Sequence, residues 1–308
     1  MRRMALAVAL CSLWFLSTRF SAAVANEVHF HHVHLNVVNP KVSSDFYRDI
    51  FGAVPVRFNN RSDAVFTERS FFLFTRVPQP ASWDLNTGIW HLGWGGVDGP
   101  REYNTLTGKG VQFQTPVSPL GNYHYMYAFG PDKEVLEVWT GYQNHRYGHV
   151  HLMSPDPVGT VRWYANTFGI GIKPQTLPPG TAAPAPGAPP FLPEPGPTSA
   201  GSGALEAIDN VNFVVFRQPT TTPVPPLWAG NAPVNTIQPT KGRAVDHIAF
   251  SYRRIQPVFD QMKKAGLTIV EPITLKPEFG FKSFFVLGPD QVLIEIVEAK
   301  PIPDSSWE

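Results

Sequence analysis

The alternation of apolar and polar residues along most of the chain predicts short strands joined by amphipathic helices. Residues 28–38 alternate and are rich in β-branched and aromatic side chains, which predicts a half-buried strand. Asn39 and Pro40 end this strand, because proline cannot donate to a strand ladder and favours the first turn of a helix. Residues 42–51 then place apolar side chains at helical spacing, and Gly52 provides a helix stop.

Further strands follow this helix, and the same order of elements then returns. Three strands are predicted near residues 54–58, 65–68 and 71–77. Residues 89–140 repeat the order more loosely, with a strand at 89–95, a helix at 100–107 and strands at 111–115, 123–129 and 135–140. The first half of the chain is thus predicted to contain two units of one strand, one helix and three strands.

Short motifs recur between the two halves of the chain. Three of them return at equivalent places: His-Val-His-Leu at 32–35 and 149–152, a histidine followed by an aliphatic residue in Trp-His-Leu at 90–92 and Asp-His-Ile at 246–248, and Gly-Pro-Asp with a later Glu at 130–137 and 288–295. Each half therefore carries one histidine on an opening strand, a second histidine on a middle strand and a glutamate near its end. Repetition at this scale indicates two copies of one structural unit.

Length and composition agree with two domains. A chain of 308 residues is typical of about two units, and an apolar share of 43% is ample for packed cores. The charged share is only 16% and the formal net charge is +1, with no basic or acidic block. Nucleic acid and anionic membrane surfaces are therefore not expected as partners. The expected partner is a small neutral or mildly anionic substrate. The oligomeric state stays open.

Residues 1–25 are expected to be a secretory signal peptide. They combine a positive start, an apolar stretch at residues 5–17 and the small-x-small site Ala23-Val24-Ala25. The apolar stretch is shorter than the roughly twenty residues that a membrane-spanning helix needs, so no stable membrane insertion is expected. Cleavage before Asn26 would give a secreted or periplasmic protein. It would also remove Cys11, the one cysteine, and with it any disulfide or thiolate ligand.

The second half of the chain contains an insertion. The separation of equivalent residues grows from 117 at the first histidine to 156 at the second, a difference of 39 residues. Residues 174–203 are crowded with Pro, Gly, Ala, Thr and Ser, which predicts a surface loop that serves as a lid or, more often, is a tolerated insertion. The predicted domains are therefore 27–142 and 145–300, the second with this Pro-rich insertion.

These motifs resemble those of a known superfamily. His-Val-His-Leu, an Asn or Asp seven residues after its first histidine, and the later Phe/Trp-Tyr and Phe-Gly pairs resemble the vicinal oxygen chelate superfamily. That superfamily includes glyoxalase I, fosfomycin- and bleomycin-resistance proteins and type I extradiol ring-cleaving dioxygenases. The resemblance covers residues 27–299 and implies an α+β fold, with paired βαβββ modules forming two cup-shaped half-barrel domains in tandem. Carried over by position, it implies two sets of metal ligands: His32, His91 and Glu137 in the first domain, and His149, His247 and Glu295 in the second.

The two glutamates favour a metal without reference to any family. Glu137 and Glu295 each lie inside an apolar strand, where an ionised carboxylate costs several kcal/mol unless a cation compensates it. A divalent metal and a buried arginine are both possible cations, but few arginines lie in apolar strands here. We therefore predict a metal in each half, with an ion pair or a core histidine as the alternative.

The pattern assigns the neighbouring histidines less definite roles. His34 and His151 lie two residues beyond the expected ligands and so on the same face of their strands. They are expected to support the ligands, to face the substrate, or to be the true ligands if the register differs. His29 and His31 have the opposite parity and are expected to be surface or packing residues.

The expected ligand set suits chemistry on a substrate with two neighbouring oxygens. Two imidazoles and one carboxylate leave three adjacent positions open, two for the substrate and one for dioxygen or water. Fe(II) or Mn(II) suits dioxygen chemistry and is favoured, whereas Zn(II) or Ni(II) suits isomerisation. The resemblance adds Tyr127, four residues before Pro131, as a catalytic tyrosine of the extradiol type. Ser118 departs from that pattern where an acid–base histidine is expected, and Phe285 replaces the tyrosine in the second domain.

Three functions therefore remain in view. The leading hypothesis is an exported metal-dependent enzyme, most like a ring-cleaving dioxygenase, acting on a small vicinal dioxygenated compound. The runner-up is a glyoxalase-like lyase or isomerase that works without a thiol cofactor, since glutathione is mainly cytosolic. The third is a non-catalytic protein that binds a drug or metabolite in an aromatic cup, against which two complete ligand sets argue.

Overall fold

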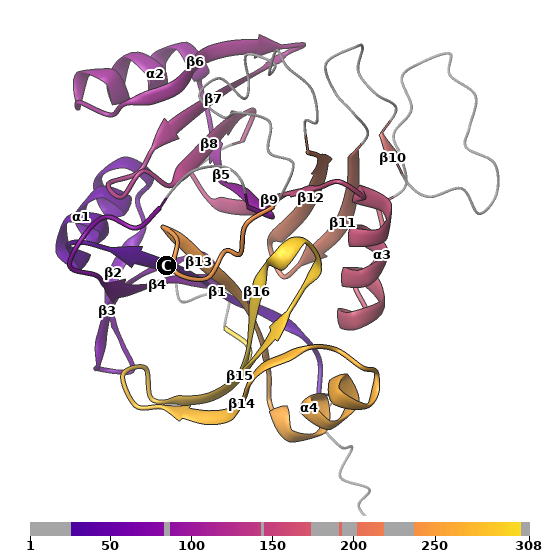
Figure 1. Cartoon of the computed structure of the whole chain (residues 1–308). Helices are drawn as coiled ribbons and strands as arrows, with labels where there is room; N and C mark the ends of the chain where they lie inside the picture. Colours follow the sequence, from indigo (N-terminus) through magenta and orange to yellow (C-terminus); the bar gives the residue numbers. More distant parts are fainter. Residues whose placement is uncertain are drawn as a thin grey trace, which may run out of the picture.

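The chain folds into four βαβββ modules that combine into two open sheets (Figure 1). The computed structural model describes residues 26–82, 87–142, 145–173, 191–192, 202–218 and 237–302. The first module comprises β1 (His29–Val37), α1 (Pro40–Phe51), β2 (Val54–Phe58), β3 (Ser62–Thr67) and β4 (Ser70–Arg76). The second comprises β5 (Ile89–Gly96), α2 (Gly99–Gly108), β6 (Phe113–Leu120), β7 (Tyr123–Phe129) and β8 (Val135–Thr140).

The second half of the chain repeats this order. The third module comprises β9 (Tyr147–Ser154), α3 (Pro157–Phe168), β10 (Phe191–Leu192), β11 (Ser202–Ile208) and β12 (Val211–Arg217). The fourth comprises β13 (Val245–Tyr252), α4 (Ile255–Lys264), β14 (Ile269–Lys276), β15 (Phe281–Leu287), a short 3-10 turn (Pro289–Gln291) and β16 (Leu293–Glu298). The predicted α+β class with paired βαβββ modules is confirmed.

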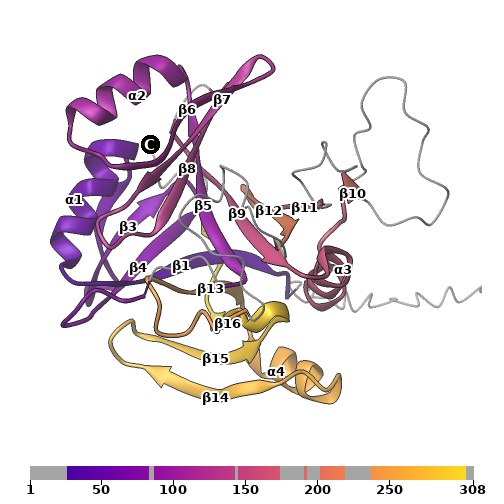
Figure 2. The same cartoon turned by 45° about the horizontal axis from the view of Figure 1, so that its top comes forward.

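The modules pair in an order that the chain does not follow. The first and fourth modules form one eight-stranded sheet, β14-β15-β16-β13-β1-β4-β3-β2, called here the terminal sheet. The second and third form the other, β10-β11-β12-β9-β5-β8-β7-β6, called the central sheet. Antiparallel pairing of β1 with β13 and of β5 with β9 joins the modules, and Figure 2 shows the two sheets side by side. Each sheet therefore draws strands from both predicted domains, 27–142 and 145–300.

Local sequence explains where the helices begin and end. The Asn39 side chain accepts hydrogen bonds from the first backbone N–H groups of α1, and Gly52 ends the helix with a left-handed φ of 68°. Asp156 and Gly169 do the same for α3, where Gly169 also has φ 68°. The predicted helix at 42–51 is thus extended by two residues at its start, because Asn39 is the cap.

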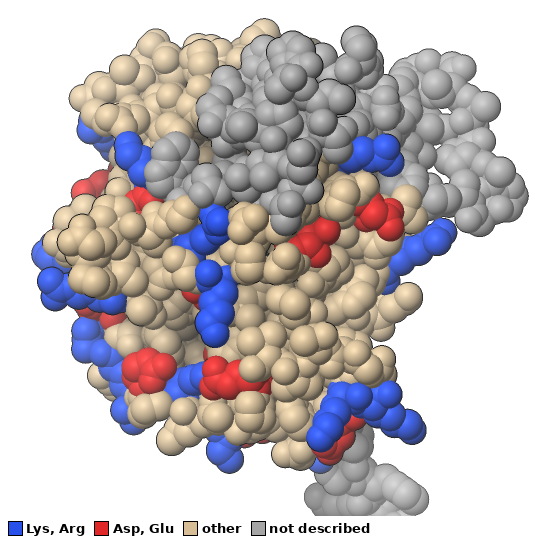
Figure 3. Space-filling view, in the orientation of Figure 1, with Lys and Arg blue, Asp and Glu red and all other residues tan. Residues whose placement is uncertain are grey.

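Some predicted segments lie outside the described residues. These are the predicted signal peptide, residues 1–25, and most of the Pro-rich insertion. Strand β10 and the first residues of β11 nevertheless fall within 174–203, so that range is not entirely a loop. Among the described helices, none is long and apolar enough to cross a membrane. On the face shown in Figure 3, acidic and basic side chains are interspersed.

One apolar core is shared by both sheets. Phe30 of the terminal sheet lies 5.9 Å, between ring centroids, from Phe213 of the central sheet. Val33 and Leu35 belong to the same buried cluster as Phe30. The histidines at positions 32 and 34 alternate with Val33 and Leu35, so they face the opposite side of the sheet. Packing on one face therefore places the predicted ligands on the other.

The repeated Gly-Pro-Asp motifs tie neighbouring modules together. Asp132 accepts hydrogen bonds from the backbone N–H of Val38 at 2.9 Å and from the Ser43 hydroxyl at 3.3 Å, just where α1 begins. Asp290 accepts one from the Thr160 hydroxyl at 2.9 Å near the start of α3. A carboxylate near a helix N-terminus is stabilised by the helix dipole. The motif thus has a structural role in both halves.

Candidate metal centres

The six expected ligands gather at two places, but in groups that differ from the sequence-based expectation. The terminal site, on the terminal sheet, consists of His32 from β1, His247 from β13 and Glu295 from β16. The central site, on the central sheet, consists of His91 from β5, Glu137 from β8 and His149 from β9. His32 and His149 have exchanged places relative to the expected triads, so that grouping is wrong. The reason is module pairing: β1 lies beside β13, and β9 beside β5.

The central site has the geometry of a single ion-binding point. His149 Nε2 lies 2.8 Å from Glu137 Oε2, and His91 Nε2 lies 3.2 Å from the same oxygen. The two Nε2 atoms are 3.4 Å apart. Three atoms that bind one ion at right angles, each about 2.1 Å from it, would be about 3 Å apart. The Tyr127 hydroxyl donates to the other carboxylate oxygen, Glu137 Oε1, at 3.0 Å, which leaves Oε2 for the imidazoles.

The terminal site has a similar geometry with different support. His32 Nε2 and His247 Nε2 lie 3.2 and 3.4 Å from Glu295 Oε2. Both Nε2 atoms are buried and neither is directed for a hydrogen bond to a described residue. His247 Nδ1 lies 2.6 Å from Asp246 Oδ1, and a carboxylate in this position typically orients a metal-binding histidine. Buried nitrogens that converge on a carboxylate without hydrogen bonds fit a divalent cation.

Charge at both sites is set by burial and by the groups that face one another. Burial opposes ionisation of Glu137, but His91 and His149 hold its pKa well below the usual value; His247 and His32 do the same for Glu295. Burial lowers the pKa of His91 to about 4, which keeps this imidazole neutral. Burial also opposes protonation of His247, but its contact with Asp246 and the facing carboxylate of Glu295 raise the pKa to about 9. Metal binding at the terminal site would therefore displace a proton.

The two flanking histidines take different positions. His151 Nδ1 lies 3.0 Å from His91 Nε2, so His151 is a candidate fourth ligand of the central site. His34 lies within reach of His32 and His247, but its Nε2 is 2.8 Å from the Thr75 hydroxyl and its ring stacks on His247. His34 is therefore better placed to support the terminal site than to complete its ligand set.

The expectation that His31 is a surface or packing residue is met in part: the residue is buried and packs on three phenylalanine rings, but it also contacts one of the expected ligands. A register shift between Phe30 and His32 in the pairing of β1 with β13 marks a β-bulge. An extra residue at this point breaks the alternation, so His31 is buried and lies beside His32, with their Nδ1 atoms 2.8 Å apart. His29 instead contacts Asp209 at the edge of the core. No pattern in the sequence marks the bulge.

Gly93 is a second residue that sequence reasoning missed. It pairs with His149 across β5 and β9, and a Cβ atom at Gly93 would lie 1.9 to 2.2 Å from three atoms of that imidazole. Any other residue would therefore push His149 away from its place in the central site. The glycine-rich run at residues 93–96 is the signal that could have indicated close approach.

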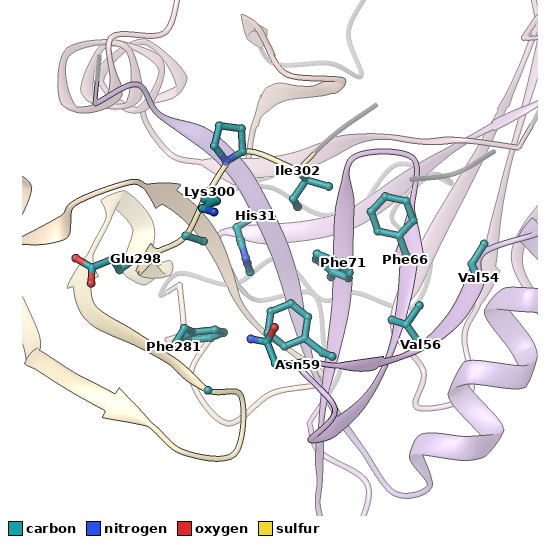
Figure 4. A pocket seen from close by; sticks show the side chains of 14 residues that line it. His31, Val54, Val56, Asn59, Phe66, Phe71, Phe281, Glu298, Lys300 and Ile302 are labelled. Atoms are coloured by element: carbon teal, nitrogen blue, oxygen red, sulfur yellow. The ribbon is translucent and has the colours of Figure 1, made fainter. Parts of the chain in front are cut away.

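A cavity of about 510 Å³ adjoins the terminal site (Figure 4). His31 lies in its wall together with Phe58, Phe71 and Phe281, and residues 299–302 form another part of the lining. Phe281 also contacts His32, with ring centroids 6.2 Å apart, so the cavity wall borders the terminal site, although none of the three ligands lines the cavity itself. The walls are mainly apolar and aromatic, which is typical of a small-molecule site.

Comparisons with known proteins agree with this architecture. Residues 146–296 match the family model described as the Glyoxalase/Bleomycin resistance protein/Dioxygenase superfamily. Glyoxalase I from Zea mays is similar in structure over 89% of this chain and 93% of its own, with 15% identity and a TM-score of 0.63. A proposed dioxygenase from Bacillus subtilis is similar over 89% of this chain and 86% of its own, with 14% identity and a TM-score of 0.55. No curated protein matches the chain in sequence.

Proposed function

We propose that this chain is a member of the glyoxalase/bleomycin resistance/dioxygenase superfamily and a metal-dependent enzyme that cleaves a ring in a small compound with two neighbouring oxygens. One observation carries the proposal. Each sheet brings two histidines and one glutamate together, with nitrogen–oxygen distances of 2.8 to 3.4 Å. A set of two histidines and one carboxylate with open positions is typical of non-haem Fe(II) oxygenases.

The residues present fit a divalent ion at both sites. Neutral imidazoles and an ionised carboxylate favour Fe(II) or Mn(II) for oxygen chemistry and are compatible with Zn(II) or Ni(II). Such an ion, when bound, supplies a positive centre that both oxygens of the substrate can chelate. The chain itself positions the ligands and excludes water: Trp90 and Phe216 pack on His151 beside the central site, and Phe281 packs on His32 beside the terminal one.

Tyr127 acts in this proposal by positioning Glu137. Its buried hydroxyl donates a hydrogen bond to Glu137 Oε1. A substrate oxygen would therefore compete with the carboxylate for this hydrogen bond. The catalytic role expected from the extradiol pattern therefore requires that substrate binding break this hydrogen bond. Phe285, at the equivalent place in the fourth module, packs on His247 and has no hydroxyl to offer.

A glyoxalase-like lyase or isomerase is the second candidate. The structural likeness to maize glyoxalase I over most of both chains favours it, as does the engaged hydroxyl of Tyr127. In this reaction the same ligand sets would hold Zn(II) or Ni(II) and no oxygen would be consumed. A protein that only sequesters small molecules would need neither buried glutamate.

Metal analysis followed by two assays separates these candidates. Protein purified without oxygen is analysed for iron, manganese, zinc and nickel, and then tested for oxygen uptake with a panel of catechols. Uptake with yellow ring-opened products supports the dioxygenase. If an iron-loaded sample takes up no oxygen but the protein converts 2-oxoaldehydes, the dioxygenase proposal is wrong and the lyase is supported. The Glu137→Gln, Glu295→Gln double variant is the control, since it should be inactive in either assay.

We further propose that the protein is exported. The support is the predicted signal at residues 1–25, which lies outside the described residues. Expression of the full chain in a bacterial host, followed by fractionation and N-terminal sequencing, should yield a secreted or periplasmic product beginning at Asn26. Full-length protein in the cytoplasm would contradict the proposal.

A further inference from the structure

His31 and His32 share one hydrogen atom between their rings. Their Nδ1 atoms are 2.8 Å apart, a distance at which one nitrogen donates and the other accepts. His32 Nε2 faces Glu295 Oε2 and needs its lone pair to bind a cation there. The hydrogen of a neutral His32 is then on Nδ1 and is donated to His31 Nδ1. It follows that His31 carries its own hydrogen on Nε2.

The rest of the His31 ring faces the cavity of the terminal site. Three aromatic rings surround it, with centroids 5.8 to 5.9 Å from its own: Phe58, Phe71 and Phe281. Two other polar residues that line the cavity are already engaged. The Asn59 amide donates to the backbone oxygen of Phe279, and Glu298 accepts from the backbone N–H of Ile255. Within the described part of the chain, the His31 side chain makes a single hydrogen bond, which is to His32.

We infer that His31 is a positioning and specificity residue that links the cavity to the terminal metal site. Its Nδ1 fixes the tautomer and orientation of His32, and its Nε2–H donates to an oxygen of the ligand. The ligand class is a small flat aromatic compound that carries a carboxylate, carbonyl or phenolate oxygen, since the surrounding rings offer stacking faces, His31 offers a donor, and the cationic Lys300 also lines the cavity. The first part of this inference rests on the proposed function, because it assumes a metal at the terminal site.

The central site provides an internal comparison. Gly148 stands at the position equivalent to His31, one residue before His149, and a register shift in the pairing of β5 with β9 occurs at the same point. The bulge is therefore present in both sheets, but only the terminal sheet has an imidazole there. Substitution of His31 should leave the central site unchanged.

Three variants separate the two roles of His31. His31→Asn keeps an acceptor near the Nδ1 position and loses the Nε2–H; His31→Gln keeps a donor near Nε2 and loses the acceptor; His31→Phe loses both. Metal affinity is measured by chelator competition in the Glu137→Gln background, where only the terminal site binds. We expect the Gln and Phe variants to bind Zn(II) or Fe(II) about 10- to 100-fold more weakly and the Asn variant to bind as before.

Ligand binding is measured separately on metal-free protein, with benzoate as the probe and toluene as a probe without oxygen. His31→Asn and His31→Phe should bind benzoate about tenfold more weakly, His31→Gln should retain it, and toluene should be unaffected by the Asn and Gln changes. Unchanged metal affinity in His31→Phe overturns the role toward His32, and unchanged benzoate binding in His31→Asn overturns the role toward the ligand. If the Glu137→Gln parent binds no metal, the proposed function fails at this site while the benzoate measurement still decides the second role.

Discussion

The terminal and central sites carry the same ligand types on equivalent strands, but they support these ligands in different ways. At the terminal site the imidazoles are held, His32 by His31 and His247 by Asp246. At the central site the carboxylate is held, by the hydroxyl of Tyr127. His91 Nδ1 is buried there without a hydrogen bond to a described residue. The duplication thus preserved the ligand set while the residues that orient it diverged.

Equivalent positions show how far this divergence extends. Five pairs differ between the terminal and central sites: His31 and Gly148, Asp246 and Trp90, Thr75 and Phe216, Phe285 and Tyr127, and Ala249 and Gly93. The terminal member is the polar one in the first three pairs, and the central member is the polar one in the fourth. Two sites built this way should differ in metal affinity and in the ligand that they accept.

The largest expected effect comes from removing one carboxylate and then one histidine. Glu137→Gln should reduce bound metal from two ions per chain to one, because an amide leaves the buried imidazoles without their charged partner. Adding His149→Ala should leave one ion, whereas adding His32→Ala should leave none. Metal analysis of the purified variants measures this. The grouping expected from sequence demands the opposite result for the two double variants.

A second difference lies where the second module meets the first. Burial raises the pKa of Glu134 from its usual 4.5 to about 7, even though the Tyr47 hydroxyl donates to it at 2.6 Å. The equivalent residue in the fourth module is Val292, and the Tyr164 hydroxyl has no partner among the described residues. The contact between the first and second modules therefore contains a carboxyl group that titrates, at Glu134, whereas the equivalent contact between the third and fourth modules has none at this position.

This junction should make stability depend on pH. Folded Glu134 keeps its proton up to about pH 7, whereas the unfolded chain loses it near 4.5. The folded state binds more protons between these values, so the free energy of unfolding should fall by about 3 kcal/mol as pH rises through them. Glu134→Gln does not titrate and should lack this fall. Urea unfolding of both proteins at pH 5 and pH 8 measures the difference, and equal pH dependence would refute it.

The supporting residues should matter more at the terminal site. Asp246→Asn removes the carboxylate that holds His247 and should weaken metal binding there by about 10- to 100-fold. Tyr127→Phe removes one hydrogen bond to the oxygen that faces away from the imidazoles and should weaken the central site about fivefold. Chelator competition measures each variant with the other site disabled. Equal losses would mean that the two kinds of support are equivalent.

The last expected effect comes from changing the residue that pairs with a ligand histidine across the sheet, Gly93 for His149 and Ala249 for His32. Gly93→Ala forces His149 to move and should destabilise the protein by about 1 to 3 kcal/mol, with weaker metal binding at the central site. Ala249→Gly is the matched change at the terminal site, where nothing clashes, and should cost about 1 kcal/mol without affecting metal. Urea unfolding and metal analysis check both. A Gly93→Ala variant with native stability and two bound ions would show that the imidazole has room.

Much of this architecture could be predicted from local patterns. The alternation of residues 28–38, the Asn39-Pro40 boundary and Gly52 predicted the first strand and helix, and the structure has them at His29–Val37 and Pro40–Phe51. Repeated motifs identified all six residues that gather at the two sites. Periodicity and turn chemistry act within a few residues, which is why the sequence reveals them directly.

The amino-acid sequence by itself determined the modules and the chemistry that each strand carries. Tertiary structure alone decided which modules share a sheet, and therefore which histidine meets which glutamate. Four similar modules present similar strand edges, so β1 could join β5 or β13 without any change in local pattern, and the structure pairs it with β13. The same holds for His31, since a bulge reverses the side of the sheet that a two-residue period assigns.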